Sequence, residues 1–219
     1  MTPQKKAKKV ISSAVLDSER RNHFVRMLIS GLFILFLVAG VFVFANRLAQ
    51  RTVADIPSLQ EQTIILVDDS GMPITLAEFV GVPVAIFFGF TYCPDICPTT
   101  LNTLAEAKHD LLQSGVNLKN MKILFVTVDP ERDTPEQLKQ YLELFETEII
   151  GLTGNISNVE KLLVRLGIFA KKVTHSDGTY FYDHSAAVYL YRSDGNFKGT
   201  IVHNEPIDFI REKIKSLVE

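Results

Sequence analysis

The stretch VAIFFGFTYCPDICPTTL, residues 84–101, decides the fold of this 219-residue chain. Its beginning, Val84–Phe90, is apolar at successive positions, which is typical of a central strand covered on both faces. Residues 99–112 follow with the apolar periodicity of a helix. Cys93 and Cys97, the chain's two cysteines, lie in the turn between them. This placement favours thiol or soft-metal chemistry, because the N–H groups at a helix N-terminus stabilise a thiolate, which is both nucleophile and metal ligand.

Buried strands and helices alternate over the rest of the chain. We predict strands at residues 63–67, 73–75, 122–128 and 149–152, a hairpin with arms at residues 180–191 and 196–202, and helices beginning at Thr134-Pro135, Ser157 and Asp208. This alternation indicates an α/β fold in which one mixed sheet is flanked by helices. A cysteine pair at the end of the first central strand is the thioredoxin-like placement, and ligands bind at the carboxyl ends of such strands.

An uncharged segment, LISGLFILFLVAGVFVFA at residues 28–45, is long enough to cross a bilayer as a helix. The first 46 residues carry a net charge of +5 and the remainder −7. A basic flank keeps the N-terminal side in the cytoplasm or matrix and exports the rest. A signal peptide cleaved after Ala45 is the alternative, but the apolar run is long for one. We therefore expect a basic cytoplasmic tail (residues 1–26), a transmembrane helix (27–46), a linker (47–60) and a thioredoxin-like domain (61–219).

The charge pattern also bears on compartment and partners. The lysine-rich start, without an arginine- and serine-rich presequence, favours a bacterial inner membrane with the domain in the periplasm over a mitochondrial inner membrane facing the intermembrane space. The acidic domain has no basic stripe to neutralise phosphates, which argues against nucleic acid. In an oxidising compartment Cys93 and Cys97 could form a structural disulfide. A disulfide that closes so short a loop would stabilise the fold little, and a domain of this size can form its core without that disulfide.

The spacing of Cys93 and Cys97 lets both sulfurs converge on one ion. Thiolates select soft metals, Cu(I) or zinc above all, and two sulfurs leave the coordination incomplete. Among the five histidines, His184 lies at an element end from which it can reach a neighbouring loop, and Asp183 could orient its ring. A structural histidine is nevertheless the commoner role. Two sulfurs and an imidazole suit trigonal Cu(I), whereas zinc prefers a fourth ligand, so copper is narrowly favoured.

A second interpretation needs no metal: Cys93 and Cys97 could cycle between dithiol and disulfide. Thioredoxin-type enzymes have two residues between their cysteines, whereas this chain has three. We expect the anionic Asp95 between the sulfurs to work against a strongly lowered thiolate pKa. This argues against an efficient general oxidoreductase.

Four blocks of sequence belong together: TYCPDICPTTL (residues 91–101), VDPERDTPEQLKQY (128–141), GLTG (151–154) and YDHSAAVYL (182–190). In this order they resemble the Sco/SenC family, membrane-anchored thioredoxin-fold proteins of cytochrome c oxidase assembly. The similarity runs from about Ser58 to the C-terminus. One departure is visible, because Asn155-Ile156-Ser157-Asn158 replaces the family's usual proline-rich helix start after GLTG.

The resemblance implies one copper ion, Cu(I) or Cu(II), bound by Cys93, Cys97 and His184, with Asp129 near the copper loop as a structural or supporting residue. Family members deliver copper to the binuclear CuA centre of oxidase subunit II, or reduce its cysteines. Some bacterial members act chiefly as thiol reductants or redox sensors. We therefore expect a copper chaperone rather than an enzyme. Its partners would be subunit II and another copper chaperone or a thioredoxin-like reductant. A thiol–disulfide reductase using Cys93 and Cys97 is the alternative, and a peroxiredoxin-type peroxidase is a third, weaker one.

Overall fold

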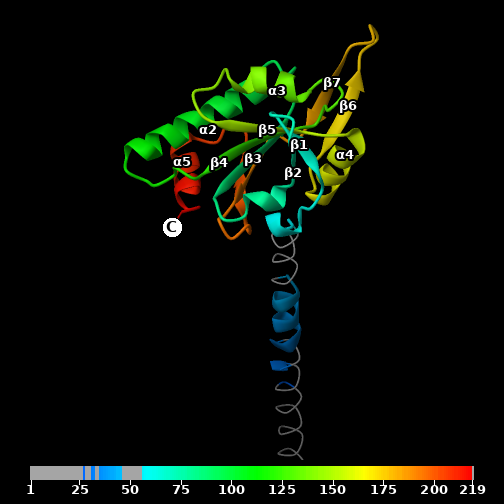
Figure 1. Cartoon of the computed structure of the whole chain (residues 1–219). Coiled ribbons are helices and arrows are strands. Elements are labelled where there is room, and N and C mark those ends of the chain that lie inside the picture. The colour runs from blue at the N-terminus through cyan, green and yellow to red at the C-terminus, as the bar shows by residue number, and fades with distance from the viewer. Residues whose placement is uncertain (1–26, 28–30, 33–34, 46–55, 219) are drawn as a thin grey trace, which may run out of the picture. The chain divides into compact units, whose positions relative to one another are not determined.

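The computed structural model describes residues 27, 31–32, 35–45 and 56–218 (Figure 1). The chain divides into two compact units, Met1–Asp55 and Ile56–Glu219. In the first unit residues 35–45 are helical, and no helix among the described residues is long and apolar enough to cross a membrane. The expected basic tail lies outside the described residues, as do parts of the expected transmembrane helix and residues 47–55 of the expected linker.

The second unit is built on a seven-stranded mixed sheet in the order β2-β1-β5-β4-β3-β8-β9. Its strands are β1 (Leu66–Asp68), β2 (Pro73–Ile74), β3 (Val84–Gly89), β4 (Lys122–Thr127), β5 (Ile149–Thr153), β8 (Val188–Tyr191) and β9 (Phe197–Ile201). The central strands β3, β4 and β5 are parallel, and the outer ones are antiparallel. The helices are α2 (Ile96–Gln113), α3 (Pro135–Leu142), α4 (Ile156–Arg165) and α5 (Ile207–Lys215), with short 3-10 turns η1 (Leu59–Glu61) and η2 (Leu76–Phe79).

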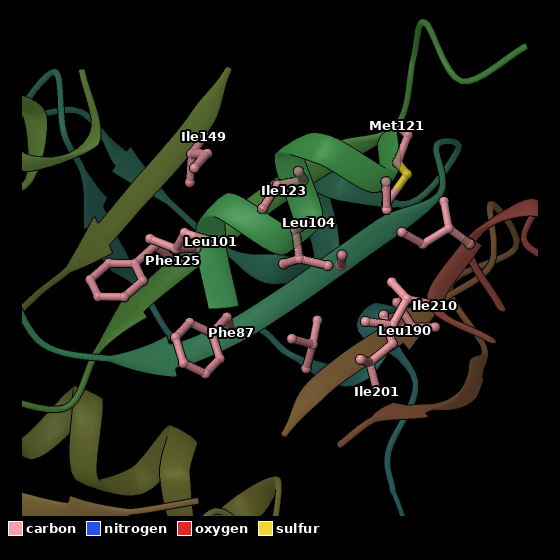
Figure 2. Packing of buried hydrophobic residues seen from close by; sticks show 14 of the residues in the cluster. Phe87, Leu101, Leu104, Met121, Ile123, Phe125, Ile149, Leu190, Ile201 and Ile210 are labelled. Atoms are coloured by element: carbon pink, nitrogen blue, oxygen red, sulfur yellow. The ribbon is translucent and has the colours of Figure 1, made fainter. Parts of the chain in front are cut away.

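Strand β3 is buried on both faces, as its continuous apolar sequence predicts. Because successive side chains of a strand point to opposite faces, Ala85 and Phe87 enter the core formed with α2, α3 and α5. Ile86 and Phe88 enter a second core formed with α4, η1 and η2. Figure 1 shows these helices on the two sides of the sheet, and Figure 2 shows the first core around Phe87. The predicted mixed sheet flanked by helices is present.

Three local predictions need correction: the first hairpin arm, the start of the helix after the cysteines and the end of the linker. The first predicted hairpin arm, residues 180–191, is two strands: β7 (Tyr180–His184) leaves the main sheet and pairs with β6 (Ala170–Thr174) in a separate two-stranded ribbon. Strand β6 has the sequence AKKVT, whose two lysines hide any strand pattern.

The helix after the cysteine turn begins earlier than predicted, at Ile96, so that Cys97 lies in its first turn. Residues 56–60 belong to the folded unit, since Leu59 is buried and its N–H donates to Gly195 O.

Gly151 permits α3 to pack directly on β5. An added Cβ would lie 2.9 Å from both Leu138 Cβ and Leu142 Cδ1. Gly151→Ala should therefore lower the free energy of unfolding by about 1–3 kcal/mol, measured by urea denaturation. Gly154→Ala is the matched control, because a Cβ added at Gly154 would lie 3.5 Å from its nearest neighbouring atom, which is an ordinary van der Waals distance. Equal effects of the two substitutions would contradict this account of the α3 contact.

Candidate metal centre

Cys93, Cys97 and His184 converge from three parts of the fold. Cys93 belongs to the loop after β3, Cys97 to the first turn of α2, and His184 to the end of β7. Their ligand atoms all lie within 4.8 Å of one another, and Cys97 Sγ is 3.8 Å from His184 Nε2. The Cys97 N–H donates to Cys93 Sγ over 3.4 Å, and the two cysteines are not joined by a disulfide. The structure thus brings together the ligand set that the sequence predicts.

The two cysteines have opposite electrostatic surroundings. The Cys97 thiol and the N–H groups of Cys97 and Asp95 hold the pKa of the half-buried Cys93 well below its usual range, although burial opposes them. The neighbouring Cys93 sulfur and complete burial raise the pKa of Cys97. The pair therefore holds one proton, and Cys93 is the thiolate. The expectation that Asp95 works against a lowered pKa is wrong, because Asp95 presents its N–H to Cys93.

The His184 ring is oriented by the backbone next to it. Its Nδ1 lies 3.0 Å from the carbonyl oxygen of Ser185, to which an Nδ1–H donates. That tautomer leaves the lone pair of Nε2 directed at Cys97, as metal binding requires. Phe87 and Phe90 pack edge-on against the ring, with centroids 6.3 and 5.7 Å away. The Ser185 carbonyl and the two aromatic rings therefore hold the imidazole in position beside the cysteines.

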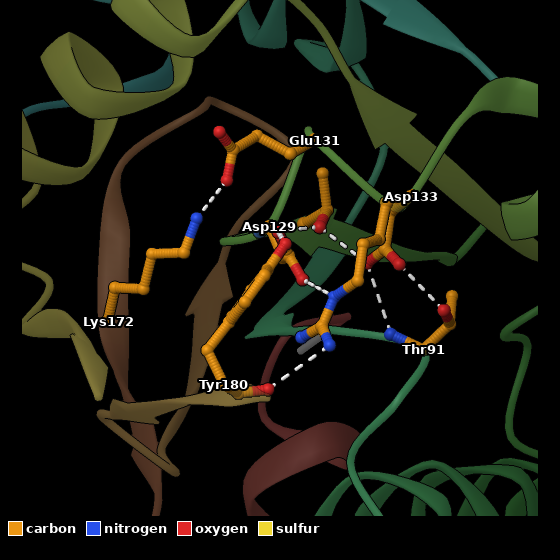
Figure 3. Close-up of polar contacts among 8 residues, drawn as sticks. Thr91, Asp129, Glu131, Asp133, Lys172 and Tyr180 are labelled. Atoms are coloured by element: carbon orange, nitrogen blue, oxygen red, sulfur yellow. Dashed lines mark hydrogen bonds and ion pairs between the residues drawn. The ribbon is translucent and has the colours of Figure 1, made fainter. Parts of the chain in front are cut away.

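The two predicted supporting carboxylates lie elsewhere. Asp183 is exposed, and strand alternation directs it away from the His184 side of β7, so the orienting contact comes from Ser185 instead. Asp129 is buried and forms an ion pair with Arg132, while the Tyr180 hydroxyl donates to its Oδ1 over 3.1 Å (Figure 3). Asp129 therefore contacts the turn end of the β6–β7 ribbon, opposite the end that carries His184, and contacts none of the three predicted ligands.

Asp133, which the sequence reasoning did not single out, holds the cysteine loop. Its carboxylate accepts hydrogen bonds from Thr91 N (3.0 Å), Thr91 Oγ1 (2.6 Å) and Thr127 Oγ1 (2.6 Å) (Figure 3). These bonds tie the loop that precedes Cys93 to the end of β4. The only sequence signal was its place in the block 128–141, where an acidic residue before Thr134-Pro135 resembles an ordinary helix entry.

Gly89 is a second residue that the sequence reasoning missed. An added Cβ at Gly89 would lie 2.8 Å from Cys97 Sγ and 2.8 Å from the Phe125 ring. Only a hydrogen side chain therefore leaves room for the buried sulfur against β3. A glycine inside a strand marks such close approaches, so the interruption of the apolar run 84–90 was an available signal.

Arg132 joins the cysteine loop to the ribbon. Its guanidinium lies 4.6 Å from the ring centre of Tyr92 and 3.8 Å from that of Tyr180. Its Nη1 donates to the carbonyl oxygen of Tyr180 over 3.1 Å. Because Tyr92 precedes Cys93 and Tyr180 begins β7, this one side chain contacts both ligand-bearing segments.

The sheet topology is that of a thioredoxin-like protein, and the site combines two thiols and an imidazole at the carboxyl end of β3. The chain therefore belongs to the class of thioredoxin-like thiol proteins that are able to hold one soft metal ion. Comparison with known proteins narrows the class. The SCO1/SenC family model matches residues 58–219, and the chain belongs to this family.

Individual relatives agree with the family match. A putative copper-binding protein from Stutzerimonas stutzeri is 34% identical over 175 residues, which cover 80% of this chain and 82% of that protein. The copper-bound ScoI structure from Arabidopsis thaliana is 31% identical, with a TM-score of 0.65 over 71% of this chain and 95% of its own. The copper-bound ScoI of Bradyrhizobium japonicum is 34% identical, with a TM-score of 0.63 over 70% of this chain and 96% of its own. The predicted family and thioredoxin-like fold are confirmed.

Removing the Asp133 carboxylate should release the cysteine loop. Asp133→Ala leaves the half-buried Thr91 and the buried Thr127 donors without an acceptor, so the free energy of unfolding should fall by about 2–4 kcal/mol in urea denaturation. Thr134→Ala is the control: it removes the adjacent N-cap of α3 and should lower the free energy of unfolding by about 1 kcal/mol. A loss no larger than that of the control would contradict the proposed role of Asp133.

The charge of Asp133 should also be visible in the pH dependence of stability. Burial raises the pKa of this carboxyl above its ordinary value, despite the hydrogen bonds from Thr127 and Thr91. Its contribution to stability is complete below the unfolded-state pKa and is lost as the pH rises through the raised pKa. Relative to the wild type, Asp133→Asn should therefore gain stability as the pH rises from the ordinary pKa of an aspartate, about 4, through the raised pKa of the folded state. A stability difference that does not change with pH would contradict this.

Proposed function

We propose that this protein is a membrane-anchored copper chaperone that binds copper through Cys93, Cys97 and His184. The observation that carries the proposal is the convergence of two sulfurs and one imidazole nitrogen within 4.8 Å. Among the described residues, no other cluster of three or more Cys, His, Asp or Glu side chains converges in this way. A Cys₂His set without a fourth protein ligand suits trigonal Cu(I) better than tetrahedral zinc. The copper-bound relatives support the same choice.

The surroundings of the three ligands suit capture and release of copper. Cys93 is already a thiolate and His184 directs a lone pair inward, so Cys97 alone must lose a proton when copper binds. Cys93 is half-buried whereas Cys97 is fully buried, and the residues Tyr92 and Ile96 near Cys93 are 58% and 36% exposed. A partner's ligands would therefore approach from the Cys93 side, between two exposed apolar side chains.

Sco proteins assist the assembly of cytochrome c oxidase, and we extend this role to the present chain. Copper is the cargo, and its destination is the CuA centre of oxidase subunit II. Residues 27–46 would form the transmembrane anchor and residues 1–26 a cytoplasmic tail, which places the copper-binding domain in the bacterial periplasm. The uncharged run 28–45 and its basic N-terminal flank support this arrangement.

His184→Ala should abolish tight copper binding without unfolding the protein. Under anaerobic, reducing conditions the wild type should bind one Cu(I) per chain. Loss of a residue that merely supports a metal ligand typically lowers the metal affinity roughly 10–100-fold. Because His184 is itself a proposed ligand, the copper affinity of the variant should fall by more than this. His203→Ala removes an exposed imidazole from a turn outside the site and is the matched control. Wild-type copper affinity in the His184 variant would end the three-ligand proposal.

A second function, reduction of a partner's disulfide, is favoured by the different states of the two thiols. The accessible Cys93 thiolate would attack the partner disulfide, form a mixed disulfide and release one partner thiolate. Cys97 would then give up its proton and attack the Cys93 sulfur. That step releases the second partner thiol and leaves Cys93 and Cys97 joined. The substrate of this reaction would be the oxidised CuA-site cysteine pair, or another exported dithiol.

The assignment of Cys93 as the attacking thiol can be tested by trapping. Cys97→Ser should accumulate a mixed disulfide with an oxidised subunit II domain, because the resolving thiol is missing. Cys93→Ser should accumulate little, because the remaining Cys97 is fully buried, and burial both shields its sulfur and raises its pKa without the help of Cys93. Non-reducing electrophoresis and mass spectrometry would detect the adduct. Equal trapping by both variants would contradict the assignment, and absence of any adduct would count against the reductase function.

A further inference from the structure

A cavity of about 320 Å³ lies between α2, α5 and the residues that lead into β8. Its apolar floor consists of side chains that are buried in the first core: Leu104, Val188, Ile201 and Ile210. Three of them, Leu104, Ile201 and Ile210, are labelled in Figure 2. Polar side chains, among them Thr103 and Glu106 of α2, form the rest of the lining.

The size and lining of this cavity suit one apolar side chain of a binding partner. Ligand pockets typically measure about 300–1,000 Å³, which places this cavity at the small end of the range. Covering an apolar floor removes apolar surface from water, and this stabilises a complex. The cavity therefore fits a single inserted side chain better than a large cofactor.

The rim of the cavity carries more negative than positive charge. Glu106 lies on the rim, and its side chain is 63% exposed. It pairs with Arg211 over 3.8 Å, and the same guanidinium also contacts Asp110 and Asp208. Three carboxylates thus share one cation, so this side of the cavity has a net negative charge. A lysine or arginine beside the inserted side chain would complement it.

The cavity lies close along the chain to two of the proposed metal ligands. Thr100, which lines the cavity, follows Cys97 by three residues of α2, a rise of about 5 Å. Ala186, which also lines it, follows His184 by two residues, which span at most about 7 Å. An extended chain advances about 3.3 Å per residue. A side chain about two to four residues from a partner's cysteine can therefore enter the cavity while that cysteine meets Cys93.

We propose that this cavity anchors the partner that exchanges copper or thiols with Cys93. The occupant is an apolar side chain next to a lysine or arginine, on the segment of the oxidase subunit II domain that carries its cysteines. The cavity thereby selects which dithiol reaches Cys93, a selection that three metal ligands alone do not make. This inference rests on the proposed function, because it takes subunit II as the partner.

The test fills the cavity or reverses its charge in the full-length protein in detergent. Thr103→Trp places a large ring in the cavity, and Asn102→Trp, at the adjacent exposed position of α2 outside the cavity, is its matched control. Glu106→Lys reverses the charge at the rim. Glu143→Lys makes the same change of net charge at an exposed residue after α3 and is the second control. Urea denaturation checks that each variant is folded.

The first readout is the binding of each reduced, metal-free protein to the soluble, copper-free CuA domain of subunit II, followed by surface plasmon resonance. Thr103→Trp should lower the affinity about tenfold, whereas Asn102→Trp should match the wild type. Glu106→Lys should slow association, and this effect should shrink at high salt, whereas Glu143→Lys should leave the association rate unchanged.

The second readout is the Cu(I) affinity without the partner, which all four variants should retain. Wild-type affinity for the CuA domain in a folded Thr103→Trp protein would overturn the proposal. Should that variant not fold, an unchanged association rate in Glu106→Lys would do so. Equal losses in the matched controls, or no binding by the wild type, would also overturn it. A wild type that binds the CuA domain but no copper would instead refute the proposed chaperone function and leave the docking result standing.

Discussion

The buried carboxylate of Asp133 is the constraint on which the rest of the site depends. Its hydrogen bonds join Thr91, at the start of the cysteine loop, to Thr127, at the end of β4. A carboxylate removed from water is tolerated only with such donors, so the loop and the strand end cannot separate without leaving a buried polar group unpaired. Cys93 follows Thr91 by two residues, and its position relative to the sheet is set by this link.

Residues 127–141 supply no metal ligand, yet they support every ligand. Asp133 holds the loop of Cys93, and Arg132 stacks on Tyr92 in that loop while bonding the first residue of β7. Tyr141 packs on the core around Cys97. The chemistry is thus divided: ligands come from three separate elements, and a single continuous segment sets the distances between them. Copper transfer and thiol exchange would use the same arrangement, because both need an accessible Cys93 backed by a buried Cys97.

The sequence was most informative where local pattern decides structure. The apolar run of β3, the cap and proline at Thr134-Pro135 and the turn at residues 193–195 were all recognisable, and they place the cysteines at the sheet's carboxyl edge. Strand β6 could not be predicted, because it forms through pairing with β7 and the Lys172–Glu131 ion pair. Likewise, the acceptor role of Ser185 depends on the direction of a backbone carbonyl, and the low pKa of Cys93 depends first on the orientation of the Cys97 thiol. Composition and spacing encode neither.

His184 reaches the cysteines from a ribbon that is separate from the main sheet, and it follows Cys97 by 87 residues. During synthesis both thiols leave the ribosome before the imidazole exists, and the loop that joins them must close before a third ligand is available. A nascent chain can therefore hold copper only by its sulfurs, as any dithiol can. The complete ligand set therefore exists only after the β6–β7 ribbon has formed and brought His184 beside the cysteine loop.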